Sequence, residues 1–370
     1  MSADYHAIRT FASPHTHGGG EIRRTMLLVL VALTPATLFG FWLYGWPAFF
    51  LWLTTLISAL CFEFMSLRLM GQKAPGHTLN DGSALLTGWL LAMTLPPWSP
   101  WWVGVLGAFI AIVIGKQVFG GLGQNVFNPA MVARVALLIS FPLQLTAWVT
   151  PLPLTPLPAP DFIAALHITL GQTPLPDAMT SASLLGYAKT ELTRGINLAQ
   201  ALTAGHAPQL SWLGVRAGSL GESSAFLILA GGIFLLFMRV IRWQAPLGVL
   251  AGVLTPALIA HALAPESHLD ASTHLCSGAL LLGAFFIATD YVTSPTTGAG
   301  QLIFGLGVGL LTWMIRTLGG YPEGVAFAIL FMNALTPIID RYIKPRILGR
   351  TWSGRPKVVP AVAADAGKGA

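Results

Sequence analysis

Two asparagines three residues apart lie in a glycine-rich stretch, FGGLGQNVFNPA, at residues 119–130. Glycines let the backbone approach a ligand closely, and amides at i and i+3 of a helix start can face one way and offer both donors and acceptors. Asn125 and Asn128 therefore suit a neutral heterocycle with alternating donors and acceptors. They suit equally well a tight loop whose side chains cap the next helix. The stretch lacks the GxxxxGK[ST] pattern, so it is not a phosphate-binding P-loop.

Two acidic residues lie at the ends of apolar segments. Asp290 ends such a segment in ATDYVTSP, where a carboxylate needs a donor partner; the alternative is a solvated turn residue. Glu63 lies near the end of the second apolar segment, where an ionisable group is costly and indicates function. Glu63 is therefore a candidate for the ion path, and the simpler alternative is an ion pair with Arg68.

Hydroxyls gather in DAMTSAS, a small polar turn that ends at Ser183. Nucleophilic catalysis is not expected there, because the nearest upstream histidine, His167, is far along the chain from Ser183. The two cysteines, Cys61 and Cys276, both lie in apolar segments, so they build neither a disulfide framework nor a CxxC metal site. No metal site is expected.

The composition is that of an integral membrane protein. Hydrophobic residues make up 54% of the 370-residue chain and charged residues only 9%, against roughly 25% charged in soluble proteins. A soluble protein is excluded, and the net charge of +6 is better explained as a topology signal than as nucleic-acid binding. The predicted fold is all-α with ten transmembrane helices, near residues 26–44, 47–64, 83–95, 101–114, 128–141, 223–240, 246–263, 275–287, 301–314 and 325–339.

The distribution of basic residues orients these helices. With the N-terminus in the cytoplasm, all but four of the 20 lysines and arginines fall on the inside, which is the bias expected of cytoplasmic segments. Both termini are therefore predicted to be cytoplasmic. The predicted divisions are a cytoplasmic N-terminus (1–25), a first five-helix repeat (26–141), a periplasmic loop (142–222), a second five-helix repeat (223–342) and a cytoplasmic tail (343–370).

Two weak sequence matches, five helices apart, suggest an internal repeat. SALLTG at 83–88 matches GALLLG at 278–283, and FNPA at 127–130 is echoed by MNALTP at 332–337. Because five is odd, the second copy enters the membrane from the other side, as in inverted-repeat transport proteins. Chance similarity between Leu/Ala/Gly-rich helices is the alternative. The third, fifth and eighth helices are short, and short helices in a membrane bundle tend to line a site.

Taken together, the FGGLGQNVFNPA stretch, ATD with the following Ser294-Pro295, the GSLGE turn at 218–222 and DAMTSAS resemble the RnfD/NqrB family over nearly the whole chain. The length and the short N-terminus resemble its RnfD branch. The resemblance implies an inner-membrane oxidoreductase subunit that passes electrons between ferredoxin and NADH while the complex moves Na⁺ or H⁺. It also implies as partners the other Rnf subunits (A, B, C, E and G) and the lipid bilayer, and no nucleic acid. The alternatives are an NqrB-like quinone reductase subunit, a secondary transporter or channel without flavin, and a structural anchor for redox subunits.

The resemblance also implies two flavins. In the family, a flavin transferase esterifies FMN to the hydroxyl that closes the motif Asp-x-x-Ser/Thr-Gly-Ala-Ser/Thr. Here that hydroxyl is Ser183, with Asp177, Thr180, Ser181 and Ala182 before it. Ser181 replaces the usual glycine and Ser183 the commoner threonine, so Thr180 and Ser181 stay alternative attachment sites. A second, non-covalent flavin, riboflavin, is implied near the cytoplasmic side at Asn125, Asn128 and Asp290.

Overall fold

The computed structural model describes residues 19–72, 75–151, 160–172, 180–181, 183–203 and 217–345. Within these residues the regular secondary structure is helical, except for one antiparallel pair of two-residue strands, β1 (Trp148–Val149) and β2 (Thr180–Ser181). Asp177 and Ala182 of the predicted attachment motif lie outside the described residues, as do the chain ends 1–18 and 346–370.

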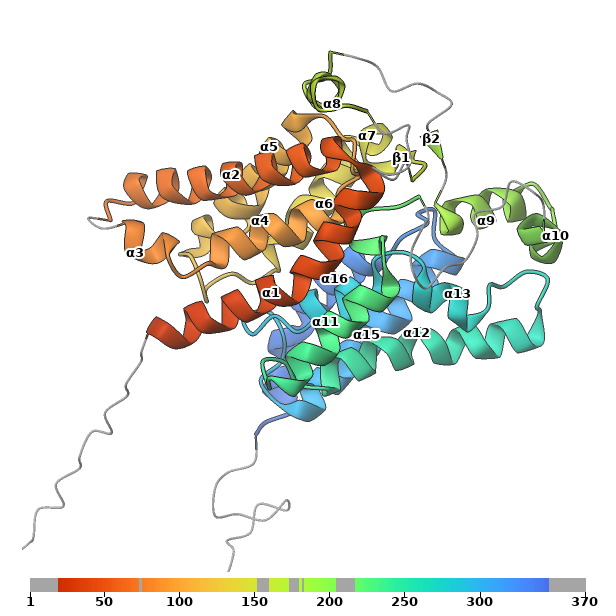
Figure 1. Ribbon diagram of the computed structural model, residues 1–370. Coiled ribbons are helices and arrows are strands. Elements are labelled where there is room, and N and C mark those ends of the chain that lie inside the picture. The colour runs from red at the N-terminus through yellow and green to blue at the C-terminus, as the bar shows by residue number, and fades with distance from the viewer. Residues whose placement is uncertain are drawn as a thin grey trace, which may run out of the picture.

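Helices at the ten predicted apolar segments form the body of the protein (Figure 1). In the first half they are α1 (Gly19–Tyr44), α2 (Trp46–Leu69), α4 (Ser83–Thr94), α5 (Trp101–Phe109) and α6 (Pro129–Ser140). In the second half they are α11 (Ala225–Phe237), α12 (Gln244–Leu263), α14 (Leu280–Leu282), α15 (Gly298–Thr317) and α16 (Val325–Tyr342). Shorter helices connect them: α3 (Pro75–Leu79), α7 (Pro142–Thr146), α8 (Phe162–Thr169), α9 (Leu184–Thr193), α10 (Leu198–Thr203) and α13 (Ala271–Cys276).

Six helical segments of the described chain are long and apolar enough to cross a membrane. They are Ile22–Tyr44, Trp46–Leu69, Trp101–Phe119, Gln244–Leu263, Gly298–Thr317 and Val325–Tyr342. The helices α4, α6 and α11 are apolar but shorter. The chain is therefore a multi-pass membrane protein, while the count of ten crossings and the inverted repeat stay predictions.

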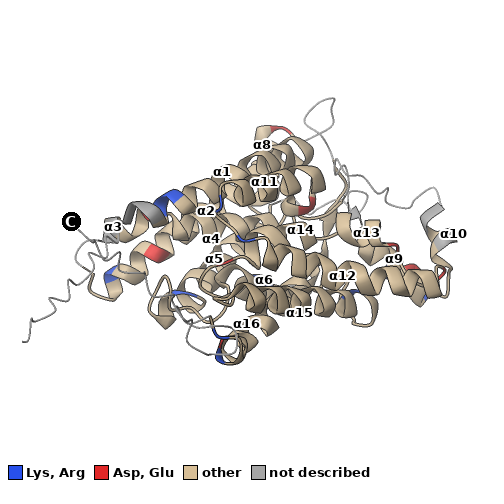
Figure 2. Ribbon diagram, turned by 90° about the horizontal axis from the view of Figure 1, so that it is seen from below, with Lys and Arg blue, Asp and Glu red and all other residues tan. Residues whose placement is uncertain are grey.

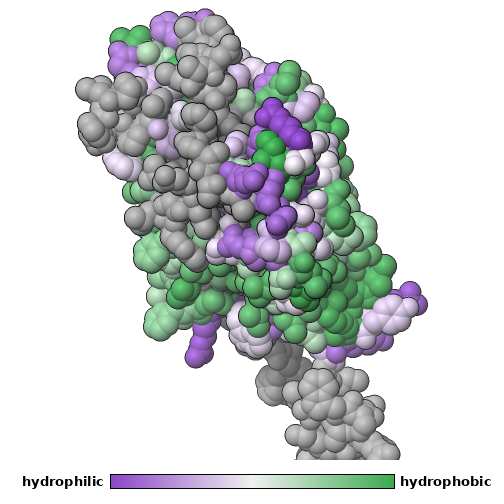
Figure 3. Space-filling view, turned by 90° about the vertical axis from the view of Figure 1, so that its right-hand side faces the viewer, coloured by the Kyte–Doolittle hydropathy of each residue, from purple (hydrophilic) through white to green (hydrophobic). Residues whose placement is uncertain are grey.

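The outer surface of the long helices is apolar. Val31, Leu38, Ile57, Leu258 and Phe331 are each more than half exposed, as side chains that face lipid would be. Most of the helical ribbon carries no charged residue (Figure 2). At the end of the molecule seen in Figure 3, hydrophilic side chains gather, while hydrophobic side chains cover the flanks.

Two helices lead into π-helical turns, in which the backbone bonds run from i to i+5. The helix α5 continues into η1 (Ile110–Ile114), and the Gly115 N–H donates to the Ile110 carbonyl at 2.8 Å. The helix α14 continues into η5 (Gly283–Ile287), which ends just before Asp290. Such turns widen a helix and often mark functional sites. Here each one places a charged residue, Lys116 or Asp290, shortly beyond its end.

The two halves of the chain meet at α6 and α16, which pack together. The backbone N–H of Asn128 donates to Oδ1 of Asn333 at 3.2 Å, and the Asn333 amide donates to the Thr293 carbonyl at 3.1 Å. These two asparagines belong to the segments that echo each other in sequence. Their contact places the start of α6 against the second half and fixes one wall of the site described below.

The long helices α12 and α15 approach each other through glycines. A Cβ atom on Gly252 would lie 2.5 Å from the Leu306 carbonyl oxygen and 3.0 Å from Cα of Gly309. Both contacts are with backbone, which cannot move aside as a flexible side chain can. Small residues permit this close approach between membrane helices.

Gly252→Ala is therefore expected to lower the melting temperature of the purified protein in detergent, although alanine favours helix formation over glycine. Overpacking of this kind typically costs about 1–3 kcal/mol. Gly320→Ala is the matched control, because nothing lies within 4 Å of a Cβ there. Equal melting temperatures for the two variants would contradict the packing argument.

Candidate functional site

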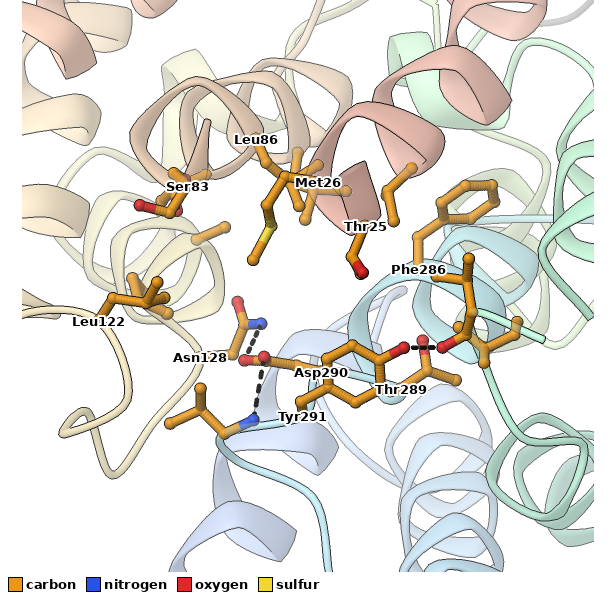
Figure 4. A pocket seen from close by; sticks show the side chains of 18 of the residues that line it. Thr25, Met26, Ser83, Leu86, Leu122, Asn128, Phe286, Thr289, Asp290 and Tyr291 are labelled. Atoms are coloured by element: carbon orange, nitrogen blue, oxygen red, sulfur yellow. Dashed lines mark hydrogen bonds between the residues drawn. The ribbon is translucent and has the colours of Figure 1, made fainter. Parts of the chain in front are cut away.

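A cavity of about 790 Å³, including its mouth, lies where the starts of α4 and α6 meet the segment after η5 (Figure 4). Its lining, mostly apolar with a few polar side chains that converge on it, is the kind that small-molecule sites present. Asn125, Asn128 and Asp290, predicted from the sequence as one site, all line it. Apolar side chains complete its wall, including Met26, Leu86, Leu122, Leu235, Phe285 and Phe286.

Asn128 is the N-cap of α6. Its Oδ1 accepts from the Met131 N–H at 3.3 Å, and Pro129 occupies the first helical turn, where no N–H is needed. Its Nδ2 donates to Oδ2 of Asp290 at 3.3 Å. The capping interpretation of this asparagine is thus confirmed, and the same side chain also lines the cavity.

Asn125 is buried and donates through Nδ2 to the Phe127 carbonyl at 3.1 Å, which fixes the loop before α6. Among the described residues, these bonds leave one N–H on Asn125, one N–H on Asn128 and the Asn125 carbonyl oxygen for a ligand. The cavity therefore offers both donors and an acceptor, as the spacing of the two amides predicted.

Asp290 lies opposite Asn128, and its carboxyl group accepts three hydrogen bonds. Its Oδ1 accepts from the Val292 N–H at 3.3 Å, and its Oδ2 accepts from Thr293 Oγ1 at 3.1 Å as well as from Asn128. Burial raises the pKa of the Asp290 carboxyl above its ordinary value, although these three hydrogen bonds act against the rise. The interpretation of Asp290 as a solvated turn residue is wrong, because the side chain has its donor partners inside the cavity.

Lys116 also lines the cavity, and the sequence reasoning did not identify it as a site residue. Its Nζ lies 2.9 Å from Oε1 of Glu63 and donates to Ser83 Oγ at 2.8 Å. The side chains of Lys116 and Glu63 are 2% and 1% exposed. The pairing of Glu63 with Arg68 is wrong: Arg68 turns outward and its guanidinium lies over the Phe64 ring, 5.4 Å from the ring centre.

A second cavity, of about 530 Å³, lies at the other end of α6 and is lined by Ser183. Ser183 is the N-cap of α9, and its Oγ accepts from the Gly186 N–H at 3.2 Å. Thr180 and Ser181 form β2, paired with Val149 and Trp148 of β1. The strand pair fixes where this part of the loop lies before α9 begins.

Arg134 of α6 lines this second cavity and is buried. Its Nη1 has no hydrogen-bond partner among the described residues, so it is a donor that an anionic ligand can meet. Glu222 lies on the same wall and forms a capping box with Ser219, whose Oγ donates to Glu222 Oε1 at 2.8 Å. The GSLGE turn at residues 218–222 thus contains one turn of 3₁₀ helix, Leu220–Glu222, closed by this capping box.

The two cavities lie along one short helix. Asn128, Pro129 and Ala130 line the first, whereas Arg134 and Leu138 line the second. At 1.5 Å per residue, the backbone distance from Asn128 to Arg134 is about 9 Å. The start of α6 thus lines one cavity, and the helix from Arg134 onward lines the other.

The chain resembles known proteins over most of its length. A family model described as the NQR2, RnfD, RnfE family matches residues 9–349. A Halorhodospira halophila protein is 50% identical over 93% of this chain and 96% of its own length. A Stutzerimonas stutzeri protein is 52% identical over 91% and 95%, and an Escherichia coli K12 protein is 42% identical over 92% and 98%. Each of the three is named as the D subunit of an ion-translocating oxidoreductase complex. The chain belongs to the NQR2, RnfD, RnfE family.

Proposed function

We propose that this chain is the D subunit of an Rnf-type ion-translocating oxidoreductase complex in the bacterial inner membrane and that it carries two flavins. The observation that carries the proposal is the pair of cavities at opposite ends of α6. One is lined by the serine that closes the flavinylation motif, and the other by two amides and a carboxylate. The names of the relatives support the same assignment.

In the first cavity, Asn125, Asn128 and Asp290 would hold the edge of a non-covalent flavin, riboflavin in this proposal. An isoalloxazine edge presents carbonyls and an N–H, which match amide donors and a carboxylate acceptor. A flavin bound there supplies reversible electron transfer. The protein supplies the hydrogen bonds that orient the ring, and the apolar wall limits access of water.

In the second cavity, Ser183 would carry FMN as a phosphoester, attached by a flavin transferase. The N-terminus of α9 and the Nη1 of Arg134 suit the negative charge of the phosphate. Glu222 and Glu323 also line this cavity, and Glu323 is held by Arg316 at 2.6 Å. The two cavities would place redox groups toward opposite faces of the membrane, as transmembrane electron transfer between ferredoxin and NADH requires.

An NqrB-like quinone reductase subunit is the alternative within the same family. A transporter or a structural anchor is the alternative outside it, and neither of these would contain flavin. Coupling to Na⁺ or H⁺ and assembly with the other Rnf subunits belong to the proposed function.

The test is the flavin content of the protein, purified from membranes of cells that also express the flavin transferase. One flavin is expected to remain with the denatured chain and fluoresce in a gel, and a second is expected in the supernatant after acid precipitation. Absence of both would overturn the proposal and favour a transporter or an anchor. Reduction of quinone, rather than NAD⁺, by the assembled complex would favour the NqrB-like alternative.

The proposed topology places residues 142–222 in the periplasm and both termini in the cytoplasm. A cysteine at the exposed Thr193, in a variant without Cys61 and Cys276, is expected to react with a membrane-impermeant maleimide in intact cells. A cysteine at the exposed Gln72 is expected to react only after lysis. The reverse pattern would invert the topology and place Ser183 on the wrong side for the proposed attachment.

A further inference from the structure

The buried ion pair between Lys116 and Glu63 is asymmetric with respect to the first cavity. Lys116 and its hydrogen-bond acceptor Ser83 line the cavity, whereas Glu63 does not. Ser83 lies across the cavity from Asp290 and Tyr291 (Figure 4). The positive member of the pair therefore faces the cavity, with the negative member behind it.

Charged side chains of both signs line this space. Among the described residues that line the cavity, the charged side chains are Lys116 and Asp290. The Asp290 carboxyl already accepts hydrogen bonds from Asn128, Val292 and Thr293. Among the described residues that line the cavity, Lys116 is therefore the positive side chain that a ligand there would meet.

A helix terminus adds partial positive charge at the cavity. The N-terminus of α6, at Pro129, lies at the cavity, and a helix N-terminus carries partial positive charge. The N-terminus of α4 also lies there, but its Ser83 N–H donates to Asp81 Oδ1 at 2.7 Å. Two of the three N–H bonds of the Lys116 ammonium are taken by Glu63 and Ser83. Among the described residues this leaves the third for a ligand.

The position of Lys116 is fixed by the backbone. It lies between the π-helical turn η1 and the 3₁₀ turn η2 (Gln117–Phe119), and the Gly121 N–H closes on its carbonyl at 3.1 Å. A lysine side chain that is 2% exposed and bonded at 2.8–2.9 Å to two partners has little freedom to turn away. Its ammonium group is therefore held in one position beside the cavity.

We propose that Lys116 and Glu63 together set the reduction potential of the flavin in this cavity: Lys116 raises it, and Glu63, as the more distant counter-charge, limits the rise. The inference rests on the proposed function, because it requires a flavin at Asn125, Asn128 and Asp290. Addition of electrons makes the ligand more negative. A fixed positive charge in a medium of low dielectric stabilises that state.

The test is potentiometric titration of the non-covalent flavin in the purified protein, followed by its absorbance. Lys116→Met is expected to increase the oxidised-to-reduced ratio at a fixed potential at least tenfold, equivalent to a midpoint about 30 mV lower for a two-electron couple. Lys116→Arg keeps the charge and is expected to stay within a few-fold of the unmodified protein.

Glu63→Gln is expected to shift the ratio the other way, because the glutamine carbonyl can still accept from Lys116 while the counter-charge is gone. Opposite shifts cannot come from a general packing defect. Arg68→Met is the matched control: it removes a positive charge from the same helix α2 as Glu63, but from an exposed side chain. It is expected to leave the ratio unchanged.

Loss of one partner of a buried ion pair can destabilise a protein. The double variant Glu63→Gln/Lys116→Met leaves neither charge unpaired, and it is expected to lower the potential by less than Lys116→Met alone. Shifts of the same sign in the two single variants, or no shift in the double variant, would overturn the inference while the flavin content still supports the proposed function. Absence of the non-covalent flavin from the unmodified protein would overturn both.

Discussion

Ser183→Ala is expected to abolish in-gel flavin fluorescence of the denatured protein, while the non-covalent flavin and the amount of protein in the membrane stay unchanged. The phosphoester needs a side-chain oxygen, and Oγ of Ser183 lies in the wall of the second cavity at the start of α9. Loss of this N-cap also costs about 1 kcal/mol. That is too little to prevent folding of a chain with so large a buried core.

Two further variants at Ser183 separate chemistry from capping. Ser183→Thr keeps a hydroxyl and is expected to retain fluorescence, whereas Ser183→Asn keeps a capping side chain but cannot form the ester. Thr180→Ala and Ser181→Ala are expected to retain fluorescence, because β2 fixes these residues in a strand pair before the helix start. Undiminished fluorescence in Ser183→Ala would contradict the assignment, and loss in Thr180→Ala or Ser181→Ala alone would move the attachment site.

The positions of two of the three short helices could be predicted from the sequence, whereas the eighth, predicted at 275–287, is broken between α13 and α14. Apolar runs of limited length, bounded by glycine, proline or asparagine, predicted helices at 83–95 and 128–141, and the structure has α4 at Ser83–Thr94 and α6 at Pro129–Ser140. At both helices the local signals agree with the packing. Asn128 followed by Pro129 is a strong helix start by itself, and no tertiary contact has to override it.

The cavity could be predicted only in part. Asn125, Asn128 and Asp290 were predicted together, and the structure brings them together. The place of Lys116 in the site could not be predicted, because its partner Glu63 is 53 residues away in the sequence. Arg68 is a nearer cation and so a simpler partner for Glu63. The sequence carries no clear signal for the pairing of Lys116 with Glu63, because a lysine at the end of an apolar helix ordinarily extends its side chain to the membrane surface.

The surroundings of Ser183 could not be predicted beyond its hydroxyl. The partners that line its cavity come from α6, from the turn at 218–222 and from the segment after α15, all far from it in sequence. In the sequence, Arg134 is one of the basic residues that the predicted topology places on the inside. In the structure it is buried in α6 and faces the second cavity. Sequence periodicity cannot show such a contact, since it depends on how the short helices pack.

Asn128→Leu is expected to reduce the flavin recovered after acid precipitation, while the covalent fluorescence at Ser183 stays unchanged. The change removes the amide that donates to Asp290 and faces the cavity. Loss of one buried hydrogen bond costs about 1–3 kcal/mol, which weakens binding by roughly ten- to a hundredfold. The measurement is the ratio of extracted to covalent flavin, which corrects for differences in protein yield.

Asn128→Asp separates the two roles of this side chain. A carboxylate can still accept from the Met131 N–H and cap α6, but it cannot donate to Asp290 and places a second acid beside it. Its flavin ratio is therefore expected to fall as in Asn128→Leu, with little loss of thermal stability. Asn80→Leu, at an amide outside the cavity, is the matched control and is expected to keep the full ratio. If Asn128→Asp retained its flavin while Asn128→Leu lost it, the asparagine would act through the helix cap alone and would not be a direct partner of the flavin.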